Sequence, residues 1–376
     1  MTPESFGLYV HIPFCLRKCN YCDFCSFSGW EKERRAAYIR ALIREILSYR
    51  GNGVPHPTVT SVFFGGGTPS LLTPGEISEI MGALRETFHL APEAEITAEV
   101  NPGALTSEAL DAFCREGFCR ISIGLQSINE NELKILGRIH TAQDFRETYR
   151  AVRAVGINNV NVDIMYDIPE QTPESFDRTL EAVLALSPEH ISAYSLIVED
   201  GTPFGDRRDT LVLPGEEAEL SMVAHLTSRL HNAGYQHYEI SNYAKPGYAC
   251  RHNLTYWHDA PYLGFGVAAA SYFDGKRYTN TRDPDAYISA GYKKNREVQV
   301  LRPEDVRYEY AMLALRLTEG LSLSEYRERF GLDFTAGKEK LLARLAAAGY
   351  LTMDAQRLSL TETGFYVSNE ILTQIL

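Results

Sequence analysis

The sequence predicts an α/β protein, an open or partial (β/α) barrel followed by a mainly helical module at the carboxyl end. Two observations lead to this fold. Over residues 1–245, short β-rich runs alternate with amphipathic segments of helical length, the pattern of βα units around a parallel sheet. Over residues 301–376 helical segments predominate instead. Residues 246–300 have no clear period and are expected to cover the barrel or join it to the last module.

About seven runs rich in β-branched and aromatic residues are the expected strands. They are Leu8–Ile12, Val59–Phe64, Glu95–Val100, Arg120–Leu125, Asn159–Met165, His190–Ile197 and Gln236–Ile240. The helices expected between them include Thr73–Phe88, Ser107–Glu116, Thr141–Val155 and Thr172–Leu186. Because these strands are too few for a closed eight-stranded barrel, we expect a partial one, with function at the carboxyl ends of the strands.

The last module is expected to resemble a winged helix. Its expected helices span Glu304–Leu317, Ser322–Phe330 and Thr335–Ala347. A hairpin around Asp354 and a last helix from Thr361 follow. Winged helices often bind DNA, but the acidic chain has no Lys/Arg-rich recognition helix, which favours a docking or lid role.

Composition limits the expected partners and location. The formal net charge is -12, and nucleic-acid binders usually show a basic patch, so nucleic acid is not an expected partner. No apolar stretch approaches the ~20 residues of a membrane helix, and Met1–Phe6 does not resemble a signal peptide, so we expect a cytoplasmic protein without an integral membrane segment. The cysteines are then expected to be reduced, and four crowd into Cys15–Cys25, which indicates metal binding.

A loop with three cysteines follows the first expected strand. Cys15, Cys19 and Cys22 are spaced so that their thiolates can hold three corners of a [4Fe–4S] cubane. The fourth iron then has no protein ligand, and the amino and carboxylate groups of S-adenosylmethionine can chelate it. Structural zinc is the alternative, because zinc prefers four ligands and Cys25 lies three residues beyond Cys22.

The second expected strand ends in a glycine-rich turn, Phe64–Ser70 (FGGGTPS). Glycine lets a ligand approach the backbone, and free N–H groups there can meet the methionyl end of the cofactor. A triple glycine is usually only a tight turn. This one falls at the next strand end after the cysteine loop, where both can face one ligand.

Six motifs occur in order at successive expected strand ends: HIPFCxxxCxYC, FFGGGTPS, EVNP, IGLQS, LGRIH and DIMYDIPEQT. Together they resemble the radical-SAM family that contains the oxygen-independent coproporphyrinogen III oxidases and the heme chaperones. The resemblance covers nearly the whole chain. It implies a radical-SAM barrel, a [4Fe–4S] cluster, S-adenosylmethionine and an electron donor such as a flavodoxin or ferredoxin. Zinc becomes the minor interpretation.

The resemblance also implies which residues contact S-adenosylmethionine. Tyr9 matches a tyrosine near the cluster, and Gly66, Gly67 and Thr68 match residues that line the cofactor site. Glu99 of EVNP matches an acidic residue at the ribose or amino end of the cofactor, a suitable place for a carboxylate that accepts two hydrogen bonds. A solvated carboxylate at a strand end is the alternative for Glu99.

Four further residues match family positions that hold a second S-adenosylmethionine in the oxidase: Tyr21, Gln126, Arg138 and Asp163. Arg138 could instead pair with a surface acid, and Asp163 could cap the next helix. The family usually has Gly at the position of Asp167, so this chain departs from it at the local turn.

Cys25 has a separate interpretation. The oxidases typically have a fourth cysteine two residues after the third, where this chain has Phe24. A fourth ligand at Cys25 would occupy the position that S-adenosylmethionine needs, so we expect a small free thiol packed beside the loop. The remaining cysteines are expected to act as small hydrophobes: Cys114, Cys119 and Cys250.

Two features favour the heme-chaperone branch of the family. The cysteine loop begins at residue 15, which leaves no room for the long amino-terminal extension that covers the active site of the oxidase. His252–Trp257 (HNLTYW) also matches an HNxxYW signature of the chaperones. We therefore expect a chaperone that transfers heme to a client hemoprotein. Radical oxidative decarboxylation of coproporphyrinogen III to protoporphyrinogen IX is the alternative, and the sequence assigns no catalytic residue.

His252, Tyr256 and Trp257 are the expected heme contacts, because a histidine can ligate iron and aromatic rings can form a flat wall. A hydrogen-bonded loop packed on the barrel is the alternative. The family often has a histidine near the end of the segment Leu263–Ala270, where this chain has alanine. If that histidine binds heme, this protein needs another ligand.

Overall fold

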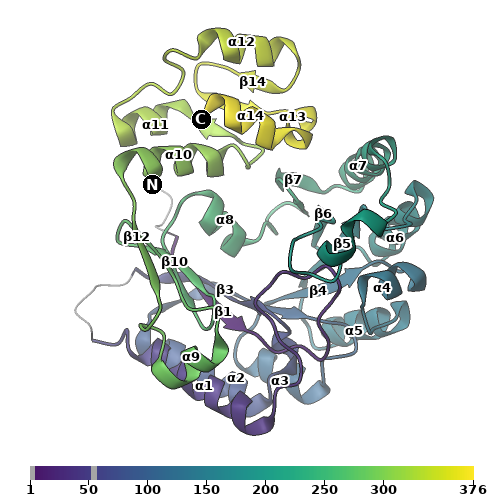
Figure 1. The fold of residues 1–376 in the computed structure, drawn as a ribbon, viewed down its shortest axis with the longest axis vertical. Coiled ribbons are helices and arrows are strands. Elements are labelled where there is room, and N and C mark those ends of the chain that lie inside the picture. Colours follow the sequence, from purple (N-terminus) through teal and green to yellow (C-terminus); the bar gives the residue numbers. More distant parts are fainter. Residues whose placement is uncertain (1–4, 52–56) are drawn as a thin grey trace.

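A curved sheet of twelve strands forms the body of the protein. The computed structural model describes residues 5–51 and 57–376. The strand order is β12-β11-β10-β9-β1-β2-β3-β4-β5-β6-β8-β7. In Figure 1 the helices α1 to α7 cover the outer face of this sheet, and a second, smaller body lies beyond its inner face.

The central strands are parallel and alternate with helices, as the sequence predicts. These strands are β1 (Gly7–Ile12), β2 (Val59–Gly66), β3 (Leu90–Val100), β4 (Arg120–Gln126), β5 (Asn159–Tyr166) and β6 (His190–Ser195). The helices are α1 (Lys32–Leu47), α2 (Pro74–Thr87), α3 (Ser107–Arg115), α4 (Glu130–Leu136), α5 (Ala142–Ala154), α6 (Pro173–Leu186) and α7 (Glu216–Asn232). Because all six strands run the same way, their carboxyl ends meet at one edge.

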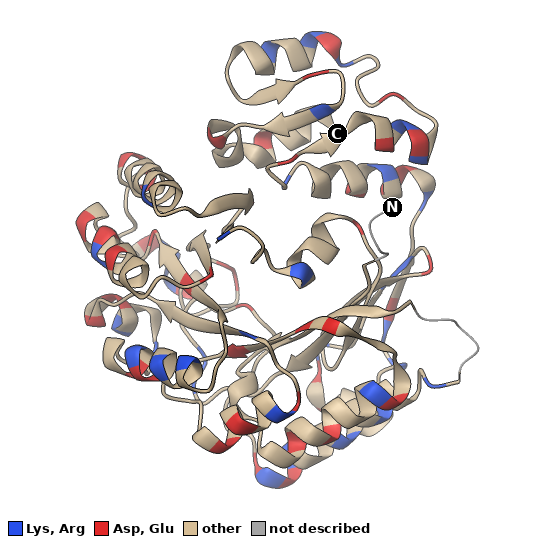
Figure 2. Ribbon diagram, turned by 180° about the vertical axis from the view of Figure 1, so that it is seen from behind, with Lys and Arg blue, Asp and Glu red and all other residues tan. Residues whose placement is uncertain are grey.

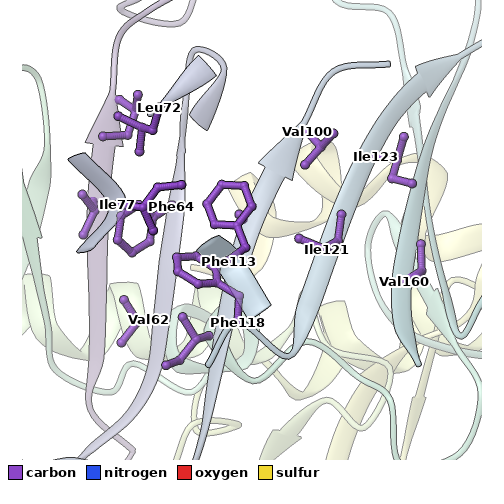
Figure 3. Packing of buried hydrophobic residues seen from close by; sticks show 14 of the residues in the cluster. Val62, Phe64, Leu72, Ile77, Val100, Phe113, Phe118, Ile121, Ile123 and Val160 are labelled. Carbon is purple, nitrogen blue, oxygen red and sulfur yellow. The ribbon is translucent and has the colours of Figure 1, made fainter. Parts of the chain in front are cut away.

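Local sequence explains where several of these helices begin. The side chains of Thr73, Thr141 and Thr172 accept hydrogen bonds from the first turns of α2, α5 and α6, and each completes a capping box. Between helices and sheet lies a continuous apolar core, in which Phe64, Phe113 and Phe118 are buried together (Figure 3). This core fixes the strand register and therefore the positions of the strand ends.

The seventh expected strand is present but pairs differently. β7 (Gln236–Glu239) lies at the sheet edge, and the chain turns back at once into β8 (Asn242–Ala244), which pairs antiparallel with β6. The tight turn between the two strands explains this, because a two-residue connection joins antiparallel strands and cannot make a parallel crossover.

Residues 246–300 contribute more to the sheet than loops and a cover. They form α8 (Arg251–Trp257), β9 (Tyr262–Phe265), β10 (Ala270–Phe273), β11 (Lys276–Thr279), α9 (Pro284–Ala290) and β12 (Glu297–Val300). β9 pairs parallel with β1 and extends the barrel, and β10 to β12 continue as antiparallel strands. Each of these strands has four residues, too few to show a period in the sequence.

The carboxyl-terminal residues form a helical module with a small three-stranded sheet, β13-β15-β14. Its elements are α10 (Pro303–Ala314), β13 (Leu321–Ser322), α11 (Leu323–Phe330), α12 (Glu339–Ala347), β14 (Leu351–Met353), β15 (Arg357–Leu360), α13 (Glu362–Tyr366) and α14 (Ser368–Ile375). It has its own apolar core. The third helix begins at Glu339, four residues later than the sequence suggests.

Several contacts attach this module to the barrel. Ile240 N–H donates to Arg316 O (3.1 Å), and Arg329 Nη2 lies 2.8 Å from the buried carboxylate of Asp259, which follows α8. Both signs of charge occur along the outer helices in Figure 2. Among the residues that the structure describes, no helix has the length and apolar character needed to cross a membrane.

Candidate cofactor site

The cysteine loop leaves the end of β1 and is fixed by backbone hydrogen bonds. Cys15 N–H donates to Phe27 O (3.0 Å) and Phe27 N–H donates to Pro13 O (2.8 Å), so the two limbs of the loop lie side by side. The Asn20 side chain donates to Ile135 O (2.8 Å) at the end of α4. The loop is therefore held at both its base and its tip.

The glycine turn packs directly against this loop. Gly67 N–H donates to Ile12 O (2.8 Å), and a Cβ on Gly67 would lie 2.7 Å from Ile12 O and from Phe14 O. Gly66 has φ +104°, and a Cβ there would lie 2.3 Å from the imidazole of His11. Only glycine fits at these two positions, which is the physical reason for the motif.

Two of the three cysteine thiols lie near hydrogen-bond donors from other segments, Thr68 after β2 and Arg138 after α4. Thr68 Oγ1 is 3.6 Å from Cys15 Sγ, and Arg138 Nη1 is 3.6 Å from Cys19 Sγ. Asn101 connects the two donors, because its Nδ2 donates to Thr68 Oγ1 (2.8 Å) and its Oδ1 accepts from Arg138 Nη2 (2.8 Å). Asn101 lies in the EVNP motif, which was the sequence signal for it, although it is not among the predicted site residues.

The thiols are not arranged around one ion. Among the described residues no three His, Cys, Asp or Glu side chains converge as a single metal ion requires, and all seven cysteines are free. A zinc ion holds its sulfur ligands about 2.3 Å away, whereas the thiolates of a cubane sit at separate corners and lie farther apart. The donor set of Cys15, Cys19 and Cys22 therefore suits a cubane better than zinc.

Two carboxyl groups lie deeper, on β3 and β5. Burial, together with the charge of Asp163, raises the pKa of Glu99 to about 8, although Gly66 N–H donates to Glu99 Oε2 (3.1 Å) and opposes the rise. Burial also raises the pKa of Asp163, opposed by hydrogen bonds from Ser192 and Asn161. Glu99 is thus not a freely solvated carboxylate, and Asp163 lies within β5 and caps no helix.

Gln126 and Tyr21 are the remaining residues predicted to hold a second S-adenosylmethionine, and Asp167 is the position where the family usually has glycine. Gln126 ends β4 with φ +69°, and its Oε1 accepts from Tyr194 (2.7 Å). Burial raises the pKa of Tyr21, and the nearby positive charge of Arg138 opposes the rise. Asp167 has φ +65° and accepts from Ser195 Oγ (3.1 Å), so this residue adopts the backbone conformation that glycine adopts without strain.

A pocket of about 170 Å³ opens beside the cysteine loop. Loops after β3 and α4 complete it, and its lining includes Leu16, Cys19, Thr68, Asn101 and Arg138. Of the predicted cluster and cofactor residues, the pocket brings together Cys19, Thr68 and Arg138, and the others lie outside its lining.

The side chain of Cys25 does not join the other three cysteines of the loop. It is buried, and its thiol lies 3.4 Å from Arg282 O, to which it donates. Burial raises the pKa of this thiol, which keeps it protonated near neutral pH.

The three predicted heme residues occupy α8, between the barrel and the carboxyl-terminal module. His252 is only 1% exposed, with Nδ1 3.0 Å from Ser61 Oγ and Nε2 2.8 Å from the Tyr256 hydroxyl. Its ring stacks on Phe63 at 5.2 Å, while Trp257 faces the guanidinium of Arg316. Both ring nitrogens of His252 have partners, so iron ligation requires one of these bonds to break.

Comparisons with known proteins agree with this architecture. Residues 9–183 match the model of the Radical SAM superfamily, and residues 301–367 match the HemN C-terminal domain. The fold superposes on coproporphyrinogen III oxidase (HemN) from Escherichia coli with a TM-score of 0.85 and 26% identity, covering 99% of this chain and 90% of that one. Barrel, cysteine loop and glycine turn thus define a radical-SAM protein.

The relatives of the chain show which family of radical-SAM proteins it belongs to. The chain is 36% identical to heme chaperone HemW of Escherichia coli, over 98% of each chain. It is 34% identical to heme chaperone HemW of Synechocystis, over 98% of this chain and 95% of the relative. The chain belongs to the HemW family of radical-SAM proteins, which confirms the expected family, partial barrel and chaperone branch.

Proposed function

We propose that this protein is a cytoplasmic heme chaperone, which binds heme and transfers it to a client hemoprotein. The observation that carries the proposal is the identity of 36% along 98% of the chain with a heme chaperone HemW. We propose a barrel over residues 1–245, a segment over 246–300 that extends the barrel sheet and connects it to the end of the chain, and a docking module over 301–376.

In the proposed site, Cys15, Cys19 and Cys22 hold a [4Fe–4S] cluster. When bound, the cluster would supply an electron and an open iron for S-adenosylmethionine. The chain's own contribution is the placement of donors: Thr68 and Arg138 reach two of the thiols, and hydrogen bonds to a sulfur ligand tune a cluster. Asn101 keeps both donors in place.

S-adenosylmethionine is assigned to the edge that contains the glycine turn. Tyr9, Gly66, Gly67, Thr68 and Glu99 would bind it. A Glu99 carboxyl with a pKa of about 8 is largely protonated at neutral pH, so it can donate as well as accept a hydrogen bond. A second molecule is assigned to four further residues: Tyr21, Gln126, Arg138 and Asp163.

Heme is the proposed cargo, and His252, Tyr256 and Trp257 of α8 are its proposed contacts. Burial lowers the pKa of His252 to about 3, so its imidazole is neutral and chemically able to ligate iron. Its hydrogen bond to Tyr256 competes with ligation and must break before Nε2 can bind iron.

An acidic one-electron carrier, such as a ferredoxin or flavodoxin, is the proposed electron donor. Leu16 and Phe24 of the cysteine loop are 60% and 67% exposed, and Arg17 and Lys18 are exposed beside them. Two cations around an apolar centre, on a chain with a net charge of -12, suit an acidic partner that approaches the loop from outside.

One anaerobic experiment tests the function. Reconstituted protein is titrated with heme, and a parallel sample receives coproporphyrinogen III, a reductant and S-adenosylmethionine. We expect a stoichiometric heme-dependent absorbance change and no protoporphyrinogen. The match to coproporphyrinogen III oxidase at a TM-score of 0.85 makes the oxidase the second candidate, and formation of protoporphyrinogen would establish it instead.

A further inference from the structure

We infer that His11 is a positioning residue of the cysteine loop: it holds the limb that follows Cys22 by donating its Nε2–H to the carbonyl oxygen of Cys25. The inference rests on the proposed cluster at Cys15, Cys19 and Cys22. It adds a residue that touches neither thiol nor cofactor and acts through the backbone of the loop.

The hydrogen bonds of His11 fix its tautomer. Nε2 lies 2.9 Å from Cys25 O, and a carbonyl oxygen only accepts, so Nε2 carries the hydrogen. Nδ1 lies 2.9 Å from the Tyr9 hydroxyl. Burial lowers the pKa of His11 to about 4, so the ring is neutral and Nδ1 accepts from Tyr9. One imidazole therefore connects a proposed cofactor residue to the loop.

The fold reserves space for this imidazole. A Cβ on Gly66 would lie 2.3 Å from the His11 ring, and a Cβ on Gly266 would lie 3.0 Å from its Cβ. These glycines, at the ends of β2 and β9, have φ of +104° and +105°. Tyr38 adds a third restraint, because its hydroxyl donates to His11 O (2.8 Å) and accepts from Val267 N–H (3.1 Å). The two glycines and Tyr38 therefore hold the His11 imidazole, and with it the Nε2–H donor, in one position.

The backbone carbonyl of Cys25 is the group on the loop that accepts the hydrogen bond from His11. The side chain of Cys25 is directed to Arg282 O, so the carbonyl oxygen is what connects this residue to β1. Ser26, the next residue, lies 3.9 Å from Cys22 Sγ through its hydroxyl. Lys18 also reaches the limb at Phe24 O, but that bond is exposed, where such contacts stabilise little. The buried bond from His11 therefore restrains the limb at Cys25, between Cys22 and the backbone hydrogen bonds of Phe27.

The test compares two amides that differ in reach. The side-chain nitrogen of His11→Gln falls near Nε2 and can still donate to Cys25 O, whereas that of His11→Asn falls near Nδ1 and can contact only Tyr9. His237→Phe, which replaces a half-buried imidazole on the edge strand β7, is the control. Each protein is reconstituted anaerobically as the full chain, and its fold is checked by circular dichroism.

The first measurement is the iron and sulfide content per chain. The second is the midpoint potential and electron paramagnetic resonance spectrum of the reduced cluster, with and without S-adenosylmethionine. The third is amide hydrogen exchange of residues 20–27 in the cluster-free protein. We expect His11→Asn to bind less iron, to change the spectrum and to exchange faster at Phe27, by about fivefold if one hydrogen bond of ~1 kcal/mol is lost. His11→Gln is expected to restore most of each effect.

Equal iron content, spectra and exchange in wild type, His11→Asn and His237→Phe would overturn the inference. So would a His11→Gln protein that is as impaired as His11→Asn, because the loss would then be general packing. If wild type itself binds no cluster, the proposed function fails, and hydrogen exchange in the cluster-free chain still decides whether His11 holds the limb.

Discussion

Arg138 makes a forked contact that joins the thiol of Cys19 to the barrel. Its Nη1 lies 3.6 Å from Cys19 Sγ, while Nη2 donates to Gly124 O (2.6 Å) and to Asn101 Oδ1 (2.8 Å). Burial lowers the pKa of this guanidinium, but the neighbouring Tyr21 and Cys19 groups outweigh it and raise the pKa above its ordinary high value. A half-buried, permanently positive group is therefore held against a proposed iron ligand.

Replacing Arg138 by Gln is expected to weaken both fold and site. The oxygens of Gly124 and Asn101 lose a donor, which should cost about 2 kcal/mol in the free energy of unfolding. Reconstituted iron per chain should fall as well, because the negative charge on the cluster thiolates loses a counter-charge. Urea unfolding and iron analysis measure the two effects.

Arg150→Gln, on the exposed face of α5, is the matched control and should change neither quantity. Arg138→Lys keeps the charge but not the fork, so it should recover less than half of the stability loss. Unchanged iron in Arg138→Gln would remove this residue from the proposed site.

Glu45 predicts a pH dependence of stability. Burial raises its pKa from 4.5 to about 7, although Tyr287, Gly266 and Asn280 all donate to its carboxylate. The folded chain thus holds this proton more tightly than the unfolded chain, so the stabilisation is complete below about pH 4.5 and is lost as the pH rises through 7.

The free energy of unfolding of wild type should therefore fall relative to Glu45→Gln between pH 5 and pH 9, by on the order of 3 kcal/mol. Urea unfolding at several pH values measures the difference. Glu147→Gln, at an exposed position on α5, should give a difference that does not vary with pH. A constant difference for Glu45→Gln as well would contradict the buried carboxyl.

The motifs themselves made much of the site predictable. The end of β3 at Val100 was predicted from a β-rich run, and β4 ends at Gln126, one residue beyond the predicted Leu125. Parallel strands place their ends at one edge, so separate motifs converge. The sequence could not reveal the contact of Asn101 with both Thr68 and Arg138, because it depends on side-chain positions from three loops. Nor could it assign β9, whose four residues show no period.

The proposed heme residues show a second limit of what the sequence reveals. HNLTYW marked His252, but the motif says nothing about which groups already occupy the ring nitrogens. That information required the neighbouring strand β2, which supplies Ser61, and the helical spacing that places Tyr256 four residues away.

Tyr256→Phe tests whether His252 ligates iron. The change removes the hydroxyl that lies 2.8 Å from Nε2, and a hydrogen bond of ~1 kcal/mol no longer competes with the metal. We expect heme binding to tighten about fivefold, measured by absorbance titration under anaerobic conditions. His252→Phe should abolish the same signal.

His258→Phe, one residue beyond α8 and exposed, is the control and should leave the affinity unchanged. If Tyr256→Phe and His252→Phe both bind heme as wild type does, the two side chains serve only to pack α8 against the barrel, and the iron ligand must be another residue.

The exposed cations of the cysteine loop predict a salt-dependent encounter with the electron donor. Arg17→Glu with Lys18→Glu reverses two charges beside the exposed side chains of Leu16 and Phe24. We expect reduction of the cluster by an acidic ferredoxin to slow about tenfold at low ionic strength, because steering by such charges raises association rates by 10-fold or more.

Stopped-flow absorbance of the cluster measures this rate, and dithionite, a small reductant, should reduce both proteins equally fast. The double change Lys340→Glu with Arg344→Glu, on exposed positions of α12, is the matched control for net charge. At 0.5 M salt the two rates should converge, since screening then acts within about 4 Å. If the loop variant and the control slow reduction equally, the donor responds to net charge and docks elsewhere.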